Sequence, residues 1–174
     1  MAEKKDIDKL GEEAYKLGFE YEHTYRGCGQ CLVAAVQDVL ELKNDEIFKS
    51  LTGYAGGGAV AGDSGCGAYV GGILIISSLW GRERDNFADP QRIRWRCYNI
   101  AKKLHDKFIA EYGTVICRDI QSKIMGRPFY LLDPDDMIKF DKEGGHEKVC
   151  PDVLGKAARW VVEVILEETW SPRE

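Results

Sequence analysis

The 174-residue sequence predicts an all-α protein, a compact single-domain bundle of about six or seven helices that covers residues 1–174. Apolar residues recur at spacings of three and four, as on one face of a helix, and no run alternates apolar and polar residues as a strand does. Hydrophobic residues make up 44% and charged residues 30% of the chain, the balance of an ordinary globular protein. The length suits one domain with a substantial core.

Four helices are predicted in the first half of the chain. An apolar stripe from Leu10 to Tyr21 marks the first helix, which Arg26-Gly27 ends. A second helix runs from about residue 28 to residue 42. Asn44 or Asp45 can cap a short third helix. A glycine-rich loop at residues 53–67 follows, and a fourth helix spans about residues 66–79, where Gly71 and Gly72 indicate close helix packing.

Three further helices are predicted in the second half. Asp89-Pro90 is typical of an N-cap followed by proline at the first helical position, and Gly113 ends that helix. Cys117 opens the next helix, which Gly126 closes. Residues 127–149 are predicted to be mostly a long loop with one helical turn at 135–138, of the kind that is often functional. Cys150-Pro151 begins the last helix.

Four cysteines occupy predicted helix starts, namely Cys31 (with Cys28 just before it), Cys66, Cys117 and Cys150. A helix N-terminus carries unpaired N–H groups and about half a positive charge, which favours thiolate over thiol. Because the thiolate is both the nucleophile and the metal ligand, this placement indicates redox or metal chemistry. The sixth cysteine, Cys97, lies in mid-helix on an apolar face and is predicted to belong to the core.

The Cys28-Gly29-Gln30-Cys31 pair has the spacing of a disulfide or of two ligands on one metal. No βαβ pattern surrounds it, so the usual thioredoxin context is missing. The remaining cysteines are isolated, which disfavours a simple zinc module. Two helix-start cysteines without a shared role are the alternative interpretation of this pair.

Charge and composition exclude several classes of function. The net charge is −5 and no basic tract is present, so nucleic acid is not an expected partner. The uncharged stretch at residues 64–81 is too short in its apolar part to span a membrane. The charged N-terminus does not resemble a secretory signal, and six cysteines then favour a reducing, cytoplasmic location. Trp170 and the glycines of the fourth helix allow a homodimer.

The segment from Gly56 through Cys66-Gly67-Ala68-Tyr69-Val70-Gly71 contains Cys-Gly-Ala-x-x-Gly, with Cys31 upstream and Cys117 and Cys150 downstream. In this it resembles the C_GCAxxG_C_C family of redox-active proteins and, distantly, the helical domain of split-Soret cytochromes, whose cysteines suggest an iron–sulfur site. The resemblance implies a redox site at Cys31, Cys66, Cys117 and Cys150, with Cys28 as an extra partner. No Cys-x-x-Cys-His is present, so covalent haem is not implied.

Three functions fit these residues. The favoured one is an iron–sulfur cluster for electron transfer to an unknown redox partner protein, with the ligands Cys31, Cys66, Cys117 and Cys150. The second is cofactor-free thiol–disulfide exchange by Cys28 and Cys31 with Cys66. The third is a non-enzymatic zinc-binding or ligand-binding module. If the protein is an enzyme, it is expected to be an oxidoreductase, and its candidate catalytic residues are Cys28, Cys31, Cys66, Cys117 and Cys150.

Overall fold

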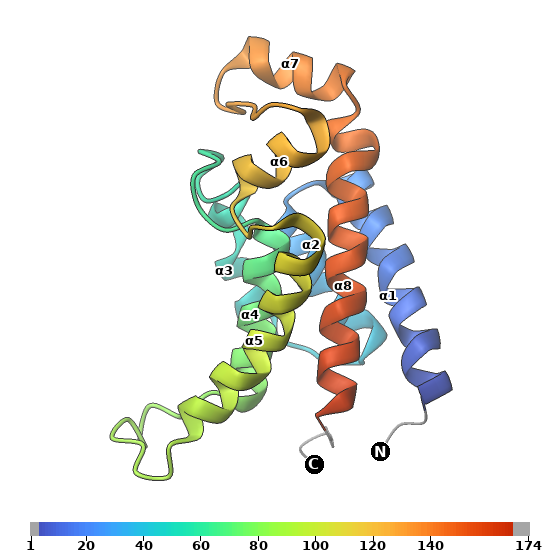
Figure 1. The fold of residues 1–174 in the computed structure, drawn as a ribbon. Helices are drawn as coiled ribbons and strands as arrows, with labels where there is room; N and C mark the ends of the chain where they lie inside the picture. Colours follow the sequence, from blue (N-terminus) through green and yellow to red (C-terminus); the bar gives the residue numbers. More distant parts are fainter. Residues whose placement is uncertain (1–3, 169–174) are drawn as a thin grey trace.

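Helices form the regular structure of residues 4–168, the part of the chain that the computed structural model describes (Figure 1). Apart from one isolated bridge between Gly65 and Ile116, these residues form no β-structure, so the predicted all-α class is confirmed. Eight α-helices are present in the described residues, against the six or seven expected: α1 (Lys4–Tyr25), α2 (Cys28–Val39), α3 (Asp45–Ser50), α4 (Gly67–Trp80), α5 (Ile93–Tyr112), α6 (Cys117–Met125), α7 (Pro134–Lys142) and α8 (Cys150–Glu167). A 3₁₀ turn, η1 (Thr52–Tyr54), follows α3, and a π-helical turn, η2 (Gly145–Val149), leads directly into α8.

Helices α1 and α8 pack against each other and lie side by side in opposite directions (Figure 1). The α8 side chains Leu154, Ala158 and Val161 are fully buried, as the broad apolar face of this helix predicts. Polar contacts join the pair at its edge, where the Tyr15 hydroxyl donates to the Asp152 carboxylate over 2.7 Å. The pair therefore forms one side of the core.

Helix α4 lies in the middle of the bundle and packs against α2, α5 and α8. A Cβ atom at Gly72 would lie only 2.6 Å from side-chain atoms of Leu104 and Val161, so this glycine permits the close approach that the sequence predicts. Gly71 and Gly72 are buried within the chain and do not form an exposed face for a dimer. Trp170, the other residue invoked for a dimer, lies outside the described residues.

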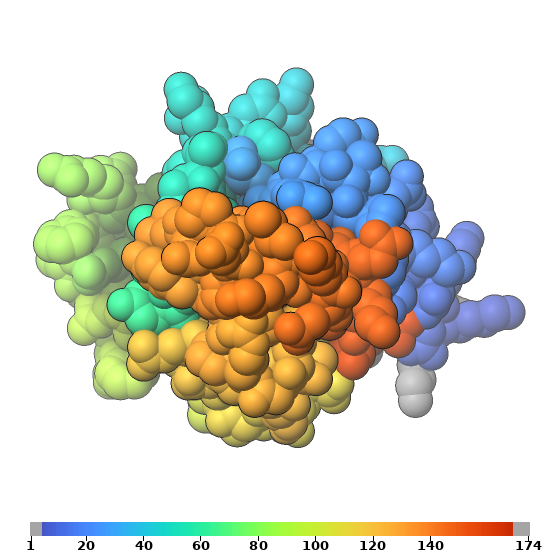
Figure 2. All heavy atoms as spheres, turned by 90° about the horizontal axis from the view of Figure 1, so that it is seen from above, coloured from blue at the N-terminus to red at the C-terminus, as the bar shows by residue number. Residues whose placement is uncertain are grey.

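The direction of the helices brings several helix starts together. Helices α2, α4 and α8 all begin at the end of the bundle where α1 finishes, and α6 lies across the same end (Figure 1). Seen from above, the segment that contains α7 covers the centre of this end (Figure 2). Residues that are far apart in the sequence therefore meet at one end of the molecule.

Two predicted boundaries differ from the structure. Residues 127–149 are not mostly loop, because they contain α7 and the π-helical turn η2. Helix α7 begins where the Asp133 side chain accepts a hydrogen bond from the backbone N–H of Asp136, with proline at the first position. Helix α5 begins at Ile93 rather than Pro90, because the buried Asp89 carboxylate accepts from the N–H groups of Ile93 and Arg94 one turn later than expected.

Within residues 4–168, no helix combines the length and the apolar character that crossing a membrane requires.

Cys97 lies in the hydrophobic core with 6% of its surface exposed, which confirms its predicted place.

Candidate functional site: a cavity lined by four cysteines

Four cysteines from four different helix starts line one cavity of about 230 Å³. Cys28, Cys117 and Cys150 are the first residues of α2, α6 and α8, and Cys66 directly precedes α4. The predicted helix-start positions of Cys66, Cys117 and Cys150 are thus present, whereas at α2 it is Cys28 rather than Cys31 that begins the helix. The other polar side chains of the lining are Glu22, Arg26, Gln121 and His146. The rest of the lining consists of glycine and apolar residues, namely Gly27, Ala55, Gly56, Val60, Ala68, Ile120, Leu131, Met137, Val149 and Val153.

Backbone hydrogen bonds fix Cys66 and Cys117 relative to each other. The N–H of Cys66 donates to the carbonyl of Val115 over 2.7 Å, and the N–H of Cys117 donates to the carbonyl of Ser64 over 3.0 Å. These two bonds flank the isolated bridge between residues 65 and 116. The end of the glycine-rich loop and the start of α6 are therefore held in register, and each supplies one cysteine.

The glycine-rich loop approaches two cysteines more closely than a larger residue allows. A Cβ atom at Gly67 would lie 2.3 Å from the Cys28 sulfur, and one at Gly57 would lie 2.6 Å from the Cβ of Cys117. Gly57 also has φ = 78°, which other residues rarely adopt. The absence of a side chain at Gly67 leaves room for the Cys28 sulfur, and the backbone groups of Gly56 and Gly67 lower the pKa of this thiol.

Cys31 is not among the residues that line the cavity. It is 4% exposed, and its single S–H can donate to either of two backbone carbonyls, that of Tyr21 at 3.4 Å or that of Arg26 at 3.0 Å. The structure therefore brings together Cys28, Cys66, Cys117 and Cys150, and it places Cys31 one turn further along α2.

The electrostatic environment of the thiols differs from the sequence-based expectation of thiolates. Burial raises the pKa of Cys66 and of Cys117 to about 12, and the neighbouring thiols add to this effect. Burial also raises the pKa of Cys28 and of Cys150. Backbone hydrogen bonds from Ala68 and Tyr69 lower the pKa of Cys66, but they do not offset the loss of water. In the metal-free protein these thiols are therefore protonated at neutral pH.

Glu22 is a residue of the cavity that sequence reasoning missed. Only 3% of it is exposed, and its Oε2 atom has no hydrogen-bond partner. Burial raises the pKa of this carboxyl to about 7, against the opposing effects of Cys31 and Arg26. The signal was present in the chain, because Glu22 continues the buried series Gly11, Ala14 and Gly18 at helical spacing.

His146 is an ionisable residue of the cavity wall, as are Glu22 and Arg26. Its Nδ1 lies 2.5 Å from a carboxylate oxygen of Asp141, and its ring meets the Phe140 ring edge to face at 4.8 Å between centroids. Both contacts hold the imidazole in place. It belongs to η2, the turn that leads into Cys150.

In residues 4–168, no group of three or more His, Cys, Asp or Glu side chains is arranged to hold a single metal ion. All six cysteines have free thiols. The cavity thus presents four separate thiols spread around its wall rather than one compact set of ligands.

An all-helical domain with a cysteine-lined cavity at its helix starts is the class of protein that the fold and the site define. A family model described as "Putative redox-active protein (C_GCAxxG_C_C)" matches residues 27–164. The chain belongs to this family, as the cysteine and glycine motifs predict. The comparisons with curated proteins and with solved structures give no match.

Proposed function

We propose that the cavity holds an iron–sulfur cluster ligated by Cys28, Cys66, Cys117 and Cys150, and that the protein transfers electrons to a partner protein. The observation that carries this proposal is the presence of four thiols from four separate helix starts around one cavity. Four cysteine thiolates are the ligand set of both [2Fe–2S] and [4Fe–4S] clusters. The proposal uses Cys28 in place of Cys31 because only Cys28 lines the cavity.

The spread of the thiols favours a cluster over a single zinc ion. A zinc site needs four donors about 2.3 Å from one point, and the described residues contain no such group. The ligands of a cluster bind different iron atoms, so their sulfurs need not meet at one point. The volume of the whole cavity, about 230 Å³, also suits a multi-atom group.

The protonation of the thiols favours a cluster over thiol–disulfide exchange. Exchange begins with attack by a thiolate, and a raised pKa reduces the thiolate fraction. The proposed exchange pair is also divided, because Cys28 lines the cavity whereas the Cys31 thiol faces two backbone carbonyl groups. A bound metal cation displaces the thiol protons directly, and metal binding is coupled to their release.

The residues around the cavity supply a suitable environment for an iron–sulfur cluster. When bound, an iron–sulfur cluster accepts and donates single electrons. Backbone donors at Cys28 and Cys66 stabilise negative charge on these sulfurs, which raises a reduction potential. The lining includes apolar side chains, among them Val60, Ile120 and Met137, which lower the polarity around the cavity.

Anaerobic purification followed by measurement of iron, acid-labile sulfide, zinc and visible absorption tests the proposal. We expect iron and sulfide in the wild-type protein, their loss in Cys66→Ser, and their retention in the core control Cys97→Ser. A colourless protein that contains no iron and forms a reducible disulfide would exclude the cluster and support exchange. Stoichiometric zinc without redox activity would support the zinc-binding module.

A further inference from the structure

Gln121 bridges the cavity and the segment that covers it. Its side chain is buried, with 3% exposure, and its Oε1 atom accepts a hydrogen bond from the backbone N–H of Phe129 over 2.9 Å. Because a backbone N–H can only donate, this bond fixes the orientation of the amide. The Nε2 atom consequently faces the Cys117 sulfur, at 3.7 Å. Both ends of one amide are thus engaged, one by a cavity thiol and one by the backbone.

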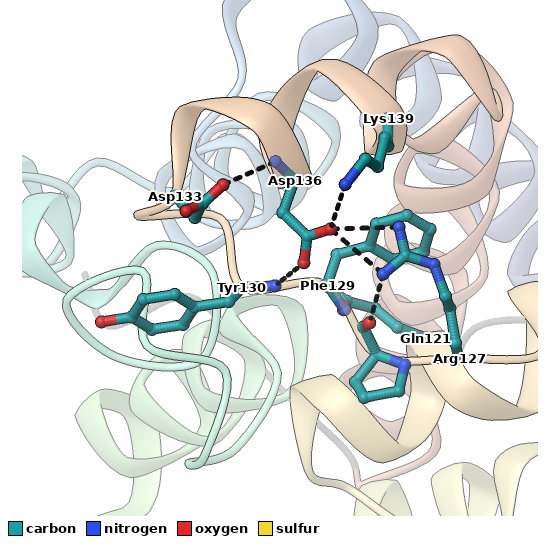
Figure 3. A network of polar contacts seen from close by, with 8 residues as sticks. Gln121, Arg127, Phe129, Tyr130, Asp133, Asp136 and Lys139 are labelled. Carbon is teal, nitrogen blue, oxygen red and sulfur yellow. Dashed lines mark hydrogen bonds and ion pairs between the residues drawn. The ribbon is translucent and has the colours of Figure 1, made fainter.

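Phe129 belongs to a segment that we call the cover, residues 127–142, which includes α7. Two of its side chains, Leu131 and Met137, line the cavity. Figure 3 shows how Asp136 holds the cover together: its carboxylate accepts from the N–H of Tyr130 over 2.8 Å and from the guanidinium of Arg127 over 3.1 Å. The cover is thus a compact unit, and Gln121 ties it to the cysteine site.

We propose that Gln121 is a positioning residue that couples the state of the Cys117 sulfur to the closure of the cover. A neutral thiol sulfur is a weak hydrogen-bond acceptor. If a metal took the place of the Cys117 proton, the sulfur would carry negative charge, and the bond from Nε2, now 3.7 Å long, would be charge-assisted and stronger. A more firmly held amide also holds Phe129 more firmly, so the occupied site would fix its own cover in the closed position that the structure shows.

This inference rests on the proposed function for the identity of the group that binds Cys117. Its structural core, the link from Cys117 through Gln121 to Phe129, is a property of the metal-free protein. The two ideas can therefore fail separately. Absence of iron from the wild-type protein would remove the cluster, whereas the link is tested without any metal.

The first test measures amide hydrogen exchange at Phe129 in the reduced, metal-free protein. Cys117→Ala removes the acceptor of Nε2, and Cys66→Ala makes an equal deletion in the same cavity without touching Gln121. Cys117→Ala leaves the buried Nε2 donor without an acceptor, which costs about 1 kcal/mol, so we expect Phe129 to exchange about five-fold faster in Cys117→Ala and unchanged in Cys66→Ala. Equal effects of both variants, or none in Cys117→Ala, would overturn the proposal.

The second test compares wild type with Gln121→Glu before and after reconstitution with iron and sulfide. The glutamate retains an oxygen for the Phe129 N–H and loses the donor to Cys117. We expect reconstitution to slow exchange at Phe129 in the wild type but not in Gln121→Glu. The same slowing in both proteins would show that the Nε2 donor has no part in the coupling and would overturn the proposal.

Discussion

Glu22 places a carboxyl group among the thiols of the cavity, and its protonation affects the stability of the whole chain. Burial raises the pKa of this group from 4.5 to about 7, and one of its oxygens has no partner. Between these two values the folded metal-free protein holds one proton more than the unfolded chain. The free energy of unfolding therefore decreases as the pH rises from about 4.5 to about 7.

Substitution of Glu22 by glutamine tests this pH dependence. We expect Glu22→Gln to remove a slope of about 1 kcal/mol per pH unit from the free energy of unfolding across this range. Urea unfolding of both metal-free proteins at several pH values measures it. Parallel profiles for the wild type and the variant would show that Glu22 ionises as it does in water.

The thiols of the cavity are predicted to react slowly in the native metal-free protein. Burial raises the pKa of Cys66 and of Cys117 to about 12, so few of these thiols are ionised at pH 8. We expect iodoacetamide to label both cysteines at least about tenfold more slowly than in urea, since only the thiolate reacts. Mass spectrometry of the labelled peptides gives the rates. Equal rates in native and unfolded protein would contradict the burial argument.

At the scale of the element, the packing of α4 depends on the absence of a side chain at Gly72. A methyl group there would lie 2.6 Å from Leu104 and Val161, both fully buried. We expect Gly72→Ala to reduce the free energy of unfolding by about 1–3 kcal/mol. Gly53→Ala is the matched control, because a Cβ atom at Gly53 meets nothing within 4 Å. Similar stabilities of the two variants would contradict the close packing of α4.

The cover is predicted to loosen in acid through Asp136. The N–H of Tyr130 and the Arg127 guanidinium hold the pKa of this carboxyl below its usual range. A lowered pKa contributes stability that is present above the usual value of about 3.9 and is lost as the pH falls through the lowered pKa. We expect the Tyr130 amide to keep its protection from pH 7 to about pH 5 and to lose it below about pH 4.

Asp136→Asn provides the comparison for the cover. The variant cannot ionise, so its Tyr130 amide exchange, after correction for the intrinsic effect of pH, should show no acid transition of its own. An identical acid transition in the wild type and in Asp136→Asn would assign the loosening to another group.

The helices with long apolar stripes could be predicted from the sequence, and short or irregular ones could not. Helix α7 buries Phe140 as its one fully enclosed residue, which is too little periodicity to recognise. In α1, the buried face runs through Gly11, Ala14, Gly18 and Glu22 rather than along the larger apolar residues, because α8 approaches closely there. Glu22 was missed for this reason.

At the scale of the whole molecule, the cysteine-lined cavity forms because several helices begin at the same end of the bundle. Helices α2, α4 and α8 begin at one end of the bundle, and the pairing of residues 65 and 116 adds the start of α6 (Figure 1). Sequence patterns predict where each helix begins, but they do not state which starts meet, since that depends on long-range packing. The sequence alone therefore identified the helix-start cysteines, but it favoured Cys31 with Cys28 as an extra partner, whereas Cys28 is the one that lines the cavity with the others.

The most direct test of the account compares iron content in two single variants purified without oxygen, Cys28→Ser and Cys31→Ser. The two cysteines are one helical turn apart in α2, yet only Cys28 lines the cavity with Cys66, Cys117 and Cys150. If the cluster is held in the cavity, Cys28→Ser loses most of its iron and sulfide while Cys31→Ser retains them. Loss of iron in Cys31→Ser with retention in Cys28→Ser would contradict the account.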